Sequence, residues 1–502
     1  MTTPTLFSPT GEAAADLRRY GSYIDGAWTT AEDRDLVDVT NPATEEAIAQ
    51  VGVASVEDVD RAVLAARRAH DVDGWGQTTP AERKAVLVRF AEIMERRKHE
   101  LVDLNIAECG SVRWFAEAGQ VGGAIAHLRS TIDAMDTFDW ERSSQVHFGN
   151  GIGQGQIVRE SYGVAALISA YNFPLWLNMT KLAPALAAGC SVILKPATVT
   201  PLEGLILAEI GEEAGLPAGA LNVIVGGRVP TQALTTHDGV DMVSFTGSDA
   251  VGSEIYQQAA ASIKKVVLEL GGKSANIVLE DADLDAVAAQ VVTHTIIQAG
   301  QGCSLLMRTL VHRSRYDELV EKVAAGLAAV TVGDPTDPAT QMGPLISAAQ
   351  RDKVESLIAD GVASGARLVT GGGRPARLDR GYFVEPTLFA DVDNSMRIAR
   401  EEIFGPVNVV IGFDTDDEAV SIANDSPYGL SGAVNTADPR RAYDIARRLR
   451  TGAVVLNGGG GAFPDISMPF GGYKASGIGR EYGEWGLEEY LQTKSIGWAA
   501  AR

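Results

Sequence analysis

The sequence predicts an α/β fold, with a doubly wound parallel sheet followed by a second α/β unit. Between residues 163 and 280, apolar runs of strand length alternate with helical stretches, as expected of parallel strands buried on both faces. A second series of the same kind runs from about residue 284 to residue 475. At 502 residues the chain is too long for one ordinary core, so we expect two or three domains.

Short strands and helices are expected before the first series. Residues 20–55 read as short strands and turns, and helices begin at about Val56. Residues 79–82 (TPAE) form a capping box that predicts a helix start at Pro80. Apolar residues then recur at helical spacing, which indicates a stripe facing the core. They are Val86, Leu87, Phe90, Ile93 and Met94.

The first sheet is expected to contain buried strands joined by helices. The runs that predict these strands are GVAALIS, CSVILK, LNVIV, MVSFT and KVVLEL. A second capping box at residues 200–203 (TPLE) predicts a helix directly after the segment LKPAT. In open sheets of this kind, ligands bind outside the carboxyl ends of the strands. The segments KPAT, FTGS and LELGG fall at such ends, so we expect a binding site there.

The second series predicts a similar alternation of helices and strands. Helices are expected near residues 284–299, 315–330, 349–365, 416–424 and 438–449. Strands are expected at residues 309–312, 382–390, 407–412, 429–435 and 452–457. The last segment, EEYLQTKSIGWAA, is strand-like.

The bulk composition narrows the function classes. A net charge of −22 argues against nucleic acid or an anionic membrane surface as a partner. The 3 cysteines are too few for a disulfide framework, and a reactive thiol needs a reducing compartment. We see no signal peptide and no run near the ~18 apolar residues of a membrane span, so we expect a cytoplasmic protein. The 7 histidines show no metal-ligand spacing, so we expect no metal site.

The most informative stretch surrounds Cys303, in the segment IIQAGQGCSLLMR. Gly300 and Gly302 open the backbone before Cys303 to close approach by a ligand or another segment. A thiol suits a reaction in which a carbonyl is attacked and the adduct is later released. Glu269, beside the glycines of LELGGK, is the carboxylate that we pair with it. The alternative is that Cys303 is an inert packing residue, as most free cysteines are.

Seven segments in a fixed order carry a resemblance to a known family. They are AYNFPL at 170–175, LKPAT at 194–198, FTGS at 245–248 with Gly252, LELGGK at 268–273, GQGC at 300–303, EEIFGPV at 401–407 and PFGGYKASGIGRE at 469–481. On these segments the chain resembles the NAD(P)-dependent aldehyde dehydrogenases nearly end to end. The resemblance implies a cofactor-binding domain, a catalytic domain and an oligomerisation arm that makes a homodimer or homotetramer. Their expected ranges are 1–142 with 160–270, 271–477, and 143–159 with 478–502, respectively.

The resemblance implies a role for each catalytic residue. Cys303 attacks the aldehyde, Asn172 donates its side-chain amide to the resulting oxyanion, and Glu269 activates water to release the acid. Lys181 and Glu481 match positions that relay protons in the family. Without the resemblance, other interpretations of these residues remain. Asn172 would be a turn residue, and Glu269 would be a charged residue at the end of a strand. Lys181 and Glu481 would form an ordinary ion pair.

The resemblance also implies a site for NAD or NADP and a small-molecule aldehyde substrate. The cofactor residues are Lys195, Thr198, Gly247, Ser248, Gly252, Leu270, Glu402 and Phe404. The FTGS turn offers backbone N–H groups and a helix dipole to the pyrophosphate. Lys195 resembles the lysine that bonds the ribose hydroxyls, and Glu402 and Phe404 match residues that hold the nicotinamide ribose and ring.

Thr198 departs from the family pattern. NAD-preferring members commonly carry glutamate there, which bonds the ribose 2′-OH and repels a 2′-phosphate. Threonine removes that repulsion, and Lys195 and Arg228 are cations that could receive the phosphate. We therefore expect NADP to be accepted beside NAD. The alternative is that Thr198 only helps to start the following helix.

The substrate pocket is expected to be apolar and bulky. Its residues are Phe173, Trp176, Leu177, Gly302, Ser304 and Phe470, with Thr180 and Met307 nearby. This lining favours an aliphatic or aromatic aldehyde and offers no arginine to clamp a second carboxylate. Asp465 is expected at the tunnel mouth, where it would disfavour anionic substrates. Ile297 and Gln298 replace the family's usual aromatic-Asn pair, so we expect the nucleophile loop to pack differently.

Other functions compete with aldehyde oxidation to the acid. A CoA-acylating dehydrogenase also forms the thioester but does not need a water-activating carboxylate, so Glu269 counts against it. A thiol esterase without redox chemistry leaves FTGS, KPAT and EEIFGPV unexplained. A catalytically silent relative is disfavoured because Cys303, Glu269 and Asn172 are all present.

Overall fold

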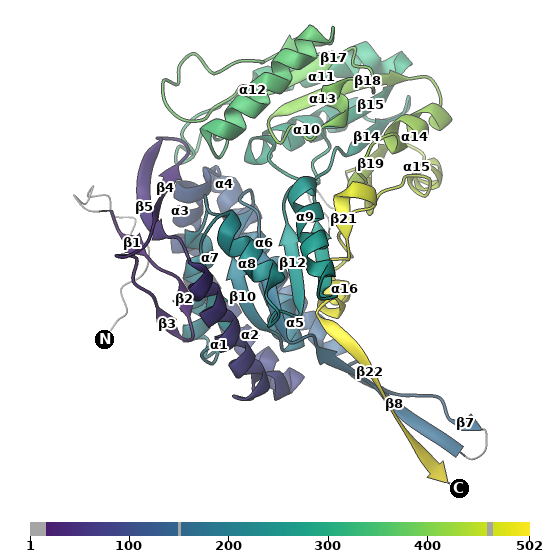
Figure 1. The fold of residues 1–502 in the computed structure, drawn as a ribbon. Coiled ribbons are helices and arrows are strands. Elements are labelled where there is room, and N and C mark those ends of the chain that lie inside the picture. The colour runs from purple at the N-terminus through teal and green to yellow at the C-terminus, as the bar shows by residue number, and fades with distance from the viewer. Residues whose placement is uncertain (1–16, 149–151, 459–464, 502) are drawn as a thin grey trace.

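The first of two large sheets organises the N-terminal half of the chain. The computed structural model describes residues 17–148, 152–458 and 465–501, arranged as in Figure 1. This sheet is 8-stranded, in the order β21-β13-β12-β9-β10-β11-β2-β3. Its central strands run parallel and are β13 (Lys265–Glu269), β12 (Met242–Thr246), β9 (Val164–Ile168), β10 (Ser191–Lys195) and β11 (Leu221–Val223). Its antiparallel edge strands are β21 (Gly477–Ile478), β2 (Tyr23–Ile24) and β3 (Ala27–Trp28).

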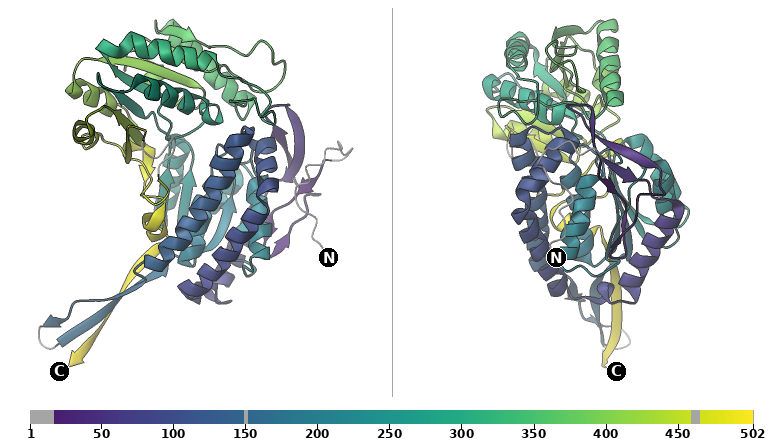
Figure 2. Two further views of the ribbon diagram at one scale, coloured as in Figure 1. Left: turned by 180° about the vertical axis from the view of Figure 1, so that it is seen from behind. Right: turned by 90° about the vertical axis from the view of Figure 1, so that its left-hand side faces the viewer.

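Helices cover both faces of this sheet, which confirms the doubly wound prediction (Figure 2). One face packs against α1 (Val56–Asp71), α8 (Arg228–Thr236) and α9 (Asp249–Ala260). The other face packs against α2 (Pro80–Arg96), α3 (Lys98–Cys109), α5 (Gly122–Thr137), α6 (Pro174–Ala188) and α7 (Leu202–Glu213). Strands β9, β10 and β12 are buried along their whole length, so their sequences are continuous apolar runs.

The capping box at the start of α2 forms as predicted. Thr79 Oγ1 accepts a hydrogen bond from Glu82 N at 3.3 Å, and Glu82 Oε2 accepts one from Thr79 N at 2.7 Å. The apolar stripe of α2 is buried, as its helical spacing indicated. These local bonds satisfy backbone N–H groups that a helix start otherwise leaves free.

The second predicted capping box, at residues 200–203, is wrong. Helix α7 begins at Leu202 without a side-chain cap from its own segment. Instead, the buried carboxylate of Glu108 accepts from Leu202 N at 2.6 Å and from Glu203 N at 3.1 Å. A distant carboxylate therefore satisfies the helix start in place of a local one.

The second sheet organises residues 275–456 and is 7-stranded, in the order β16-β17-β18-β15-β14-β19-β20. Its strands are β16 (Arg367–Thr370), β17 (Thr387–Ala390), β18 (Val407–Phe413), β15 (Arg308–His312), β14 (Ala275–Val278), β19 (Ser431–Asn435) and β20 (Ala453–Leu456). The predicted helices are confirmed as α10 (Leu284–Ile296), α11 (Tyr316–Ala328), α12 (Ala348–Ala363), α14 (Asp416–Asn424) and α15 (Pro439–Ala446). The strand expected over residues 382–390 is shorter, since only its second half pairs with β18.

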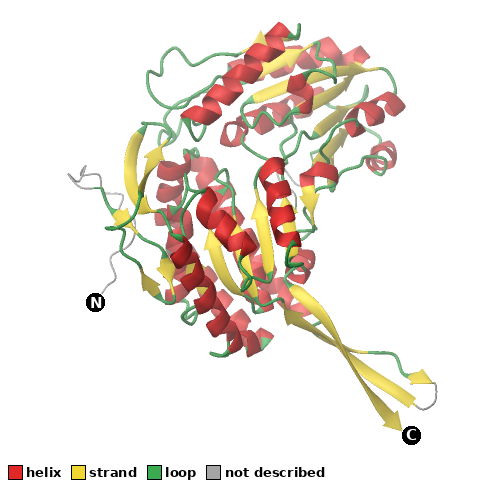
Figure 3. Cartoon of the chain, viewed as in Figure 1, coloured by secondary structure: helices red, strands yellow, loops and turns green. Residues whose placement is uncertain are grey.

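The tail strand forms a small sheet that projects from the body (Figures 1 and 3). Strand β22 (Leu491–Ala501) pairs antiparallel with β8 (Ile152–Ser161), and β6 (Glu141–Ser143) and β7 (His147–Phe148) pair with β8. The strand expected in the last segment is therefore confirmed, and it pairs with the stretch expected to belong to the same arm. Strand β21, at the expected end of the catalytic domain, belongs to the first sheet. The exact domain ranges stay predictions.

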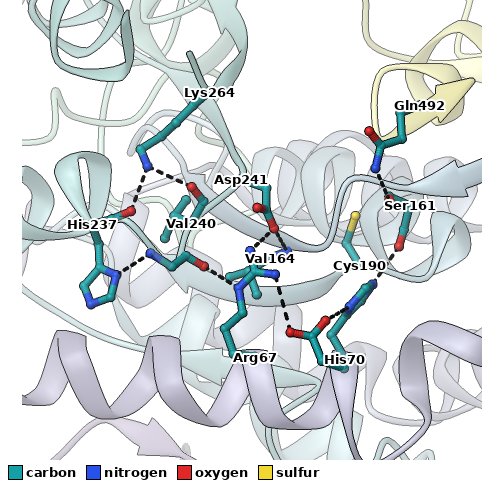
Figure 4. Close-up of polar contacts among 12 residues, drawn as sticks. Arg67, His70, Ser161, Val164, Cys190, His237, Val240, Asp241, Lys264 and Gln492 are labelled. Atoms are coloured by element: carbon teal, nitrogen blue, oxygen red, sulfur yellow. Dashed lines mark hydrogen bonds and ion pairs between the residues drawn. The ribbon is translucent and has the colours of Figure 1, made fainter. Parts of the chain in front are cut away.

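Polar side chains form hydrogen bonds and ion pairs at the amino ends of the strands in the first sheet (Figure 4). Arg67 pairs with Asp241, whose Oδ2 also accepts from Val164 N at 2.7 Å. Lys264 Nζ donates to two backbone carbonyl groups at 2.7 and 2.8 Å. Buried Cys190 precedes β10 at the same end. The carboxyl ends, where the sequence motifs fall, lie at the opposite edge. Within the described ranges, no helix has the length and apolar character needed to cross a membrane.

Candidate functional site

Cys303 follows a tight turn at the end of α10. Gln298 and Ala299 have φ values of 48° and 50°, and Gly300 has a φ of 72°, so all three adopt the left-handed region. Cys303 is a free cysteine and is partly buried as a residue. Its apolar neighbours are Leu430, Phe470 and Tyr482.

The glycines of LELGGK allow two segments to touch beside the nucleophile. A Cβ atom at Gly272 would lie 2.4 Å from the carbonyl oxygen of Cys303. A Cβ atom at Gly271 would lie 2.5 Å from Oε2 of Glu402. Gly272 therefore requires glycine, because a side chain there would meet backbone, whereas a side chain at Gly271 would displace the Glu402 carboxylate. The contact brings the loop after Glu269 onto the loop that carries Cys303.

Glu269 lies at the carboxyl end of β13, where its backbone oxygen accepts from Gly247 N at 3.1 Å. The carboxyl group is buried, and its Oε1 has no hydrogen-bond partner among the described residues. Burial and the charge of Glu481 hold its pKa well above the usual value, although Lys181 acts in the opposite direction. A carboxylate with a raised pKa is a stronger base than an exposed one.

Lys181 and Glu481 form a buried ion pair next to Glu269. Lys181 Nζ lies 2.7 Å from Glu481 Oε1 and donates to Ser244 Oγ at 3.1 Å. Lys181 lies on α6 and Glu481 in the segment after β21, so two distant parts of the chain meet here. The charges of Lys181 and Glu481 both shift the pKa of Glu269, so the ion pair interacts electrostatically with that carboxyl group.

The pKa of the Cys303 thiol is raised well above its usual value. Burial is the largest cause, followed by the negative charges of Glu269, Glu402 and Glu481. The thiol therefore needs a proton acceptor before it can act as a nucleophile. The same result shows that Glu269 and Cys303, chosen as a pair from the sequence, lie in one electrostatic environment.

Asn172 is fixed against the nucleophile loop from the other side. Its Nδ2 donates to the backbone oxygen of Gln301 at 2.9 Å, and its own carbonyl accepts from Gln120 Nε2 at 3.0 Å. The residue is 3% exposed. A side-chain amide has two N–H donors, so one remains for another acceptor near Cys303.

The cofactor residues predicted at the carboxyl ends of the first sheet lie together there. Lys195 ends β10, is buried, and donates to Pro196 O at 3.2 Å, and burial lowers its pKa to about 8. Thr198 Oγ1 donates to Gly226 O at 2.9 Å. Ser248 caps α9 by accepting from Val251 N, so Gly247 and Ser248 stand at the helix start. A Cβ atom at Gly252 would lie 2.5 Å from Leu270 Cδ2.

Glu402 and Phe404 approach this group from the second sheet. Glu402 Oε1 accepts from Gly272 N at 2.9 Å, and burial raises its pKa to about 7. Phe404 has a φ of 56°, and its ring meets that of Tyr171 edge-on at 5.9 Å. The expected phosphate partner Arg228 is exposed and pairs with Glu254 at 2.7 Å.

The expected pocket residues fall into two groups. Phe173 directly precedes α6, Trp176 and Leu177 lie near its start, and all three are buried. Phe470 stacks on Tyr482 with ring centroids 5.0 Å apart, beside Cys303. Gly302 and Ser304 flank the nucleophile, Thr180 and Met307 are buried, and Asp465 is exposed and bonded to Ser467. Of these residues, Phe470 is shown to pack against Cys303, and the rest of the expected pocket stays a prediction.

A scan against protein-family models matches the aldehyde dehydrogenase family over residues 28–496. This chain belongs to the aldehyde dehydrogenase family. It is therefore an oxidoreductase of that class, as the sequence resemblance implied.

Relatives and solved structures of aldehyde dehydrogenases cover nearly all of this chain. A 3-succinoylsemialdehyde-pyridine dehydrogenase from a Pseudomonas species is 42% identical over 477 residues, 94% of this chain and 97% of that protein. Geranial dehydrogenase from Castellaniella defragrans is 42% identical over 474 residues, 94% of this chain and 98% of that protein. A Mycobacterium tuberculosis aldehyde dehydrogenase complexed with NAD+ has a TM-score of 0.92 and 46% identity, covering 96% of this chain and 98% of that chain. A cysteine-to-alanine mutant of aldehyde dehydrogenase C from Pseudomonas syringae, with NAD+ and octanal, has a TM-score of 0.89 and 43% identity, covering 95% of this chain and 96% of that chain.

Gln298 stabilises the nucleophile loop of this aldehyde dehydrogenase, a role that the sequence did not indicate. Its Nε2 donates to Cys109 O at 3.1 Å, and its Oε1 accepts from Ser111 Oγ at 2.8 Å. Its backbone oxygen accepts from Gln301 Nε2 at 2.9 Å. The side chain thus ties the left-handed turn to the end of α3. The expectation that this loop packs differently from that of other family members stays a prediction, and the signal for it in the sequence was the departure from the family's asparagine.

We expect Gln298→Leu to lower kcat by up to ~10²-fold, since small displacements of a nucleophile have effects of that size. The KM for the cofactor should stay unchanged because the cofactor residues lie on other loops. Steady-state kinetics measures kcat and KM, and a melting curve confirms that the variant is folded. Gln298→Asn, which keeps the amide, should recover part of the loss. An unchanged kcat in the leucine variant would show that the turn does not depend on this side chain.

Proposed function

We propose that this enzyme oxidises an apolar aldehyde to the carboxylic acid with NAD(P), through a thioester on Cys303. The observation that carries the proposal is the meeting of a free, partly buried cysteine, a fixed amide and a buried carboxylate of raised pKa at one place. Each of these groups supplies what one stage of the reaction needs.

The residues present fit an NAD(P) molecule at the carboxyl ends of the first sheet. Gly247 and Ser248 stand at the start of α9, where the backbone N–H groups of the first helical turn can receive a phosphate. Lys195 would bond the ribose hydroxyls, and Glu402 with Phe404 would hold the nicotinamide half. When bound, NAD(P) supplies the acceptor for a hydride.

The first half of the reaction forms the thioester. The Cys303 thiol loses its proton and the sulfur attacks the carbonyl carbon, which turns the carbonyl oxygen into an oxyanion. The free N–H of the Asn172 amide and the backbone N–H of Cys303 would stabilise that charge. Loss of hydride from the same carbon leaves an acyl thioester on Cys303.

The second half of the reaction releases the acid. Glu269 takes a proton from water, and the water oxygen attacks the thioester carbon and expels the sulfur. The Lys181–Glu481 pair, in electrostatic contact with Glu269, would carry that proton away. Burial of all three groups keeps their charges strongly coupled.

The apolar surroundings of Cys303 support an aliphatic or aromatic aldehyde as substrate. Phe470 and Tyr482 pack beside the thiol, and Phe173 and Trp176 follow the amide donor. One relative named for geranial and one structure holding octanal point to the same chemistry. These side chains offer carbon surface in place of a cationic clamp.

The cofactor choice is testable at Thr198. We expect the wild-type enzyme to use NADP beside NAD, because Thr198 places no carboxylate at the 2′ position and bonds Gly226 O instead. Thr198→Glu should lower kcat/KM for NADP by at least ~10-fold through like-charge repulsion, and should change the value for NAD little. Initial rates with each cofactor measure the ratio. A strong NAD preference that Thr198→Gln or Thr198→Glu leaves unchanged would end the hypothesis.

We propose that the projecting sheet joins subunits into a homodimer or homotetramer. Strand β22 leaves the body paired with β8, and Ile496 and Trp498 on it are 48% and 45% exposed. Large apolar side chains exposed on such a strand are typical of a surface that another chain covers.

The experiment that tests the function is formation of NAD(P)H with both cofactors over aliphatic, aromatic and semialdehyde substrates. We expect turnover of apolar aldehydes with one acid produced per reduced cofactor. Turnover only when coenzyme A is present, with acyl-CoA as product, would instead indicate an acylating dehydrogenase. Cleavage of esters with no cofactor reduction for any aldehyde would indicate a thiol esterase.

A further inference from the structure

A small cavity behind the nucleophile loop collects positive charge. It has a volume of about 20 Å³ and lies where β14 and β19 begin. Three cationic residues line it, Lys273, Arg308 and Arg450, and its described lining contains no carboxylate. This is unusual in a chain whose net charge is −22.

Three buried donors on the cavity lining have no partner among the described residues. They are Lys273 Nζ, Arg308 Nε and Thr451 Oγ1. Lys273 is 3% exposed and Arg308 is 1% exposed, so neither reaches bulk water easily. Arg308 uses its other nitrogens on Asn394 Oδ1 at 2.6 Å and on two backbone carbonyl groups at 2.9 Å. Its Nε–H is therefore the donor left over.

Two buried cations that no carboxylate contacts through a hydrogen bond are costly. Burial together with the charge of Arg308 lowers the pKa of Lys273 to about 7, and burial lowers the pKa of Arg308 to about 10. The charges of Glu402 on Lys273 and of Asp425 on Arg308 oppose these shifts, but Glu402 accepts from Gly272 N, and Asp425 accepts from Asn394 and Arg400. Within the described residues, no carboxylate is hydrogen-bonded to Lys273 or Arg308.

We propose that the cavity binds one small monovalent anion, a halide, held by Lys273, Arg308 and Thr451. The volume suits a single water-sized group. A water molecule could fill the space, but it is uncharged and accepts only two hydrogen bonds. A halide accepts all three donors and neutralises one of the two charges.

A halide in this cavity would also support the nucleophile loop. Ser274, on the cavity lining, bonds Ser431 Oγ at 2.9 Å, and Ser431 Oγ donates to Ser304 O at 2.8 Å, next to Cys303. Arg308 N donates to Ser274 O at 3.3 Å. The site is therefore linked to the loop by direct hydrogen bonds, although its occupancy does not depend on the proposed reaction.

The test is crystallography of the full-length enzyme with bromide replacing chloride. We expect one anomalous bromide peak in this cavity, absent in Lys273→Met and present in Lys322→Met, whose lysine is on the surface and pairs with Asp285. Melting temperature should rise with bromide at constant ionic strength in the wild type and in the control variant, but not in Lys273→Met. If that variant fails to fold, Thr451→Val should raise the halide Kd at least ~10-fold. A water or no peak in the wild-type cavity, or the same bromide response in every variant, would overturn the proposal.

Discussion

Replacement of Cys303 by alanine should abolish aldehyde oxidation. We expect kcat/KM to fall by at least ~10⁴-fold, because no other group at the site can form the thioester. The cofactor should bind with unchanged affinity, since the cofactor residues lie on the first sheet, on helix α9 and in the 402–404 loop. Rates of NAD(P)H formation and a fluorescence titration of the cofactor measure both quantities.

Cys190→Ala is the matched control for this loss. Cys190 is fully buried at the amino end of β10, the opposite edge of the sheet from the site (Figure 4). Its replacement should cost stability through lost packing but leave the turnover of the folded enzyme intact. Equal loss of activity in both variants would show that the effect comes from folding. Full activity in Cys303→Ala would disprove the thioester mechanism.

The parts of the fold that could be predicted from the sequence are those set by local patterns. Strands β9, β10 and β12 are buried on both faces, so each is a continuous apolar run that can be recognised without a partner. The pairing of Glu269 with Cys303 was also expected from the sequence, and in the structure the charge of Glu269 acts on the Cys303 thiol.

The features that could not be predicted depend on contacts between distant residues. Glu108 satisfies the start of α7 from 94 positions away, so the local capping signal at residue 200 was misleading. Gln298 accepts a hydrogen bond from Ser111, which lies 187 positions away in the sequence, and no spacing in the sequence predicts that bond. Arg308 follows Cys303 closely in the chain, yet its guanidinium bonds Asn394 and carbonyl groups near residue 422. The closeness of Arg308 to Cys303 in the sequence therefore did not predict the partners of the Arg308 side chain.

Replacement of Glu269 by glutamine should separate the two halves of the reaction. We expect one equivalent of NAD(P)H per active site in a rapid burst, followed by a steady-state rate lower by about 10²–10⁴-fold. Glutamine has nearly the same volume but cannot take a proton from water, so the thioester should accumulate. Stopped-flow absorbance measures the burst, and mass spectrometry of the acid-quenched enzyme measures the acyl adduct.

The pH dependence gives this prediction a second check. The pKa of Glu269 is held well above 4.5, so water activation in the wild type should be lost as pH falls through that raised pKa and gained as pH rises. The steady-state rate of Glu269→Gln should lack this rise. Glu318→Gln, on the exposed face of α11, should behave like the wild type.

Added hydroxylamine distinguishes a trapped thioester from an inactive enzyme. As a nucleophile that needs no base, it should cleave the adduct and restore turnover in Glu269→Gln but not in Cys303→Ala. A steady-state rate in Glu269→Gln equal to that of the wild type would remove Glu269 from the mechanism. The raised pKa of Cys303 means that some group at this site must accept the thiol proton before the thiol can attack. Loss of the burst itself in Glu269→Gln would show that Glu269 is that group.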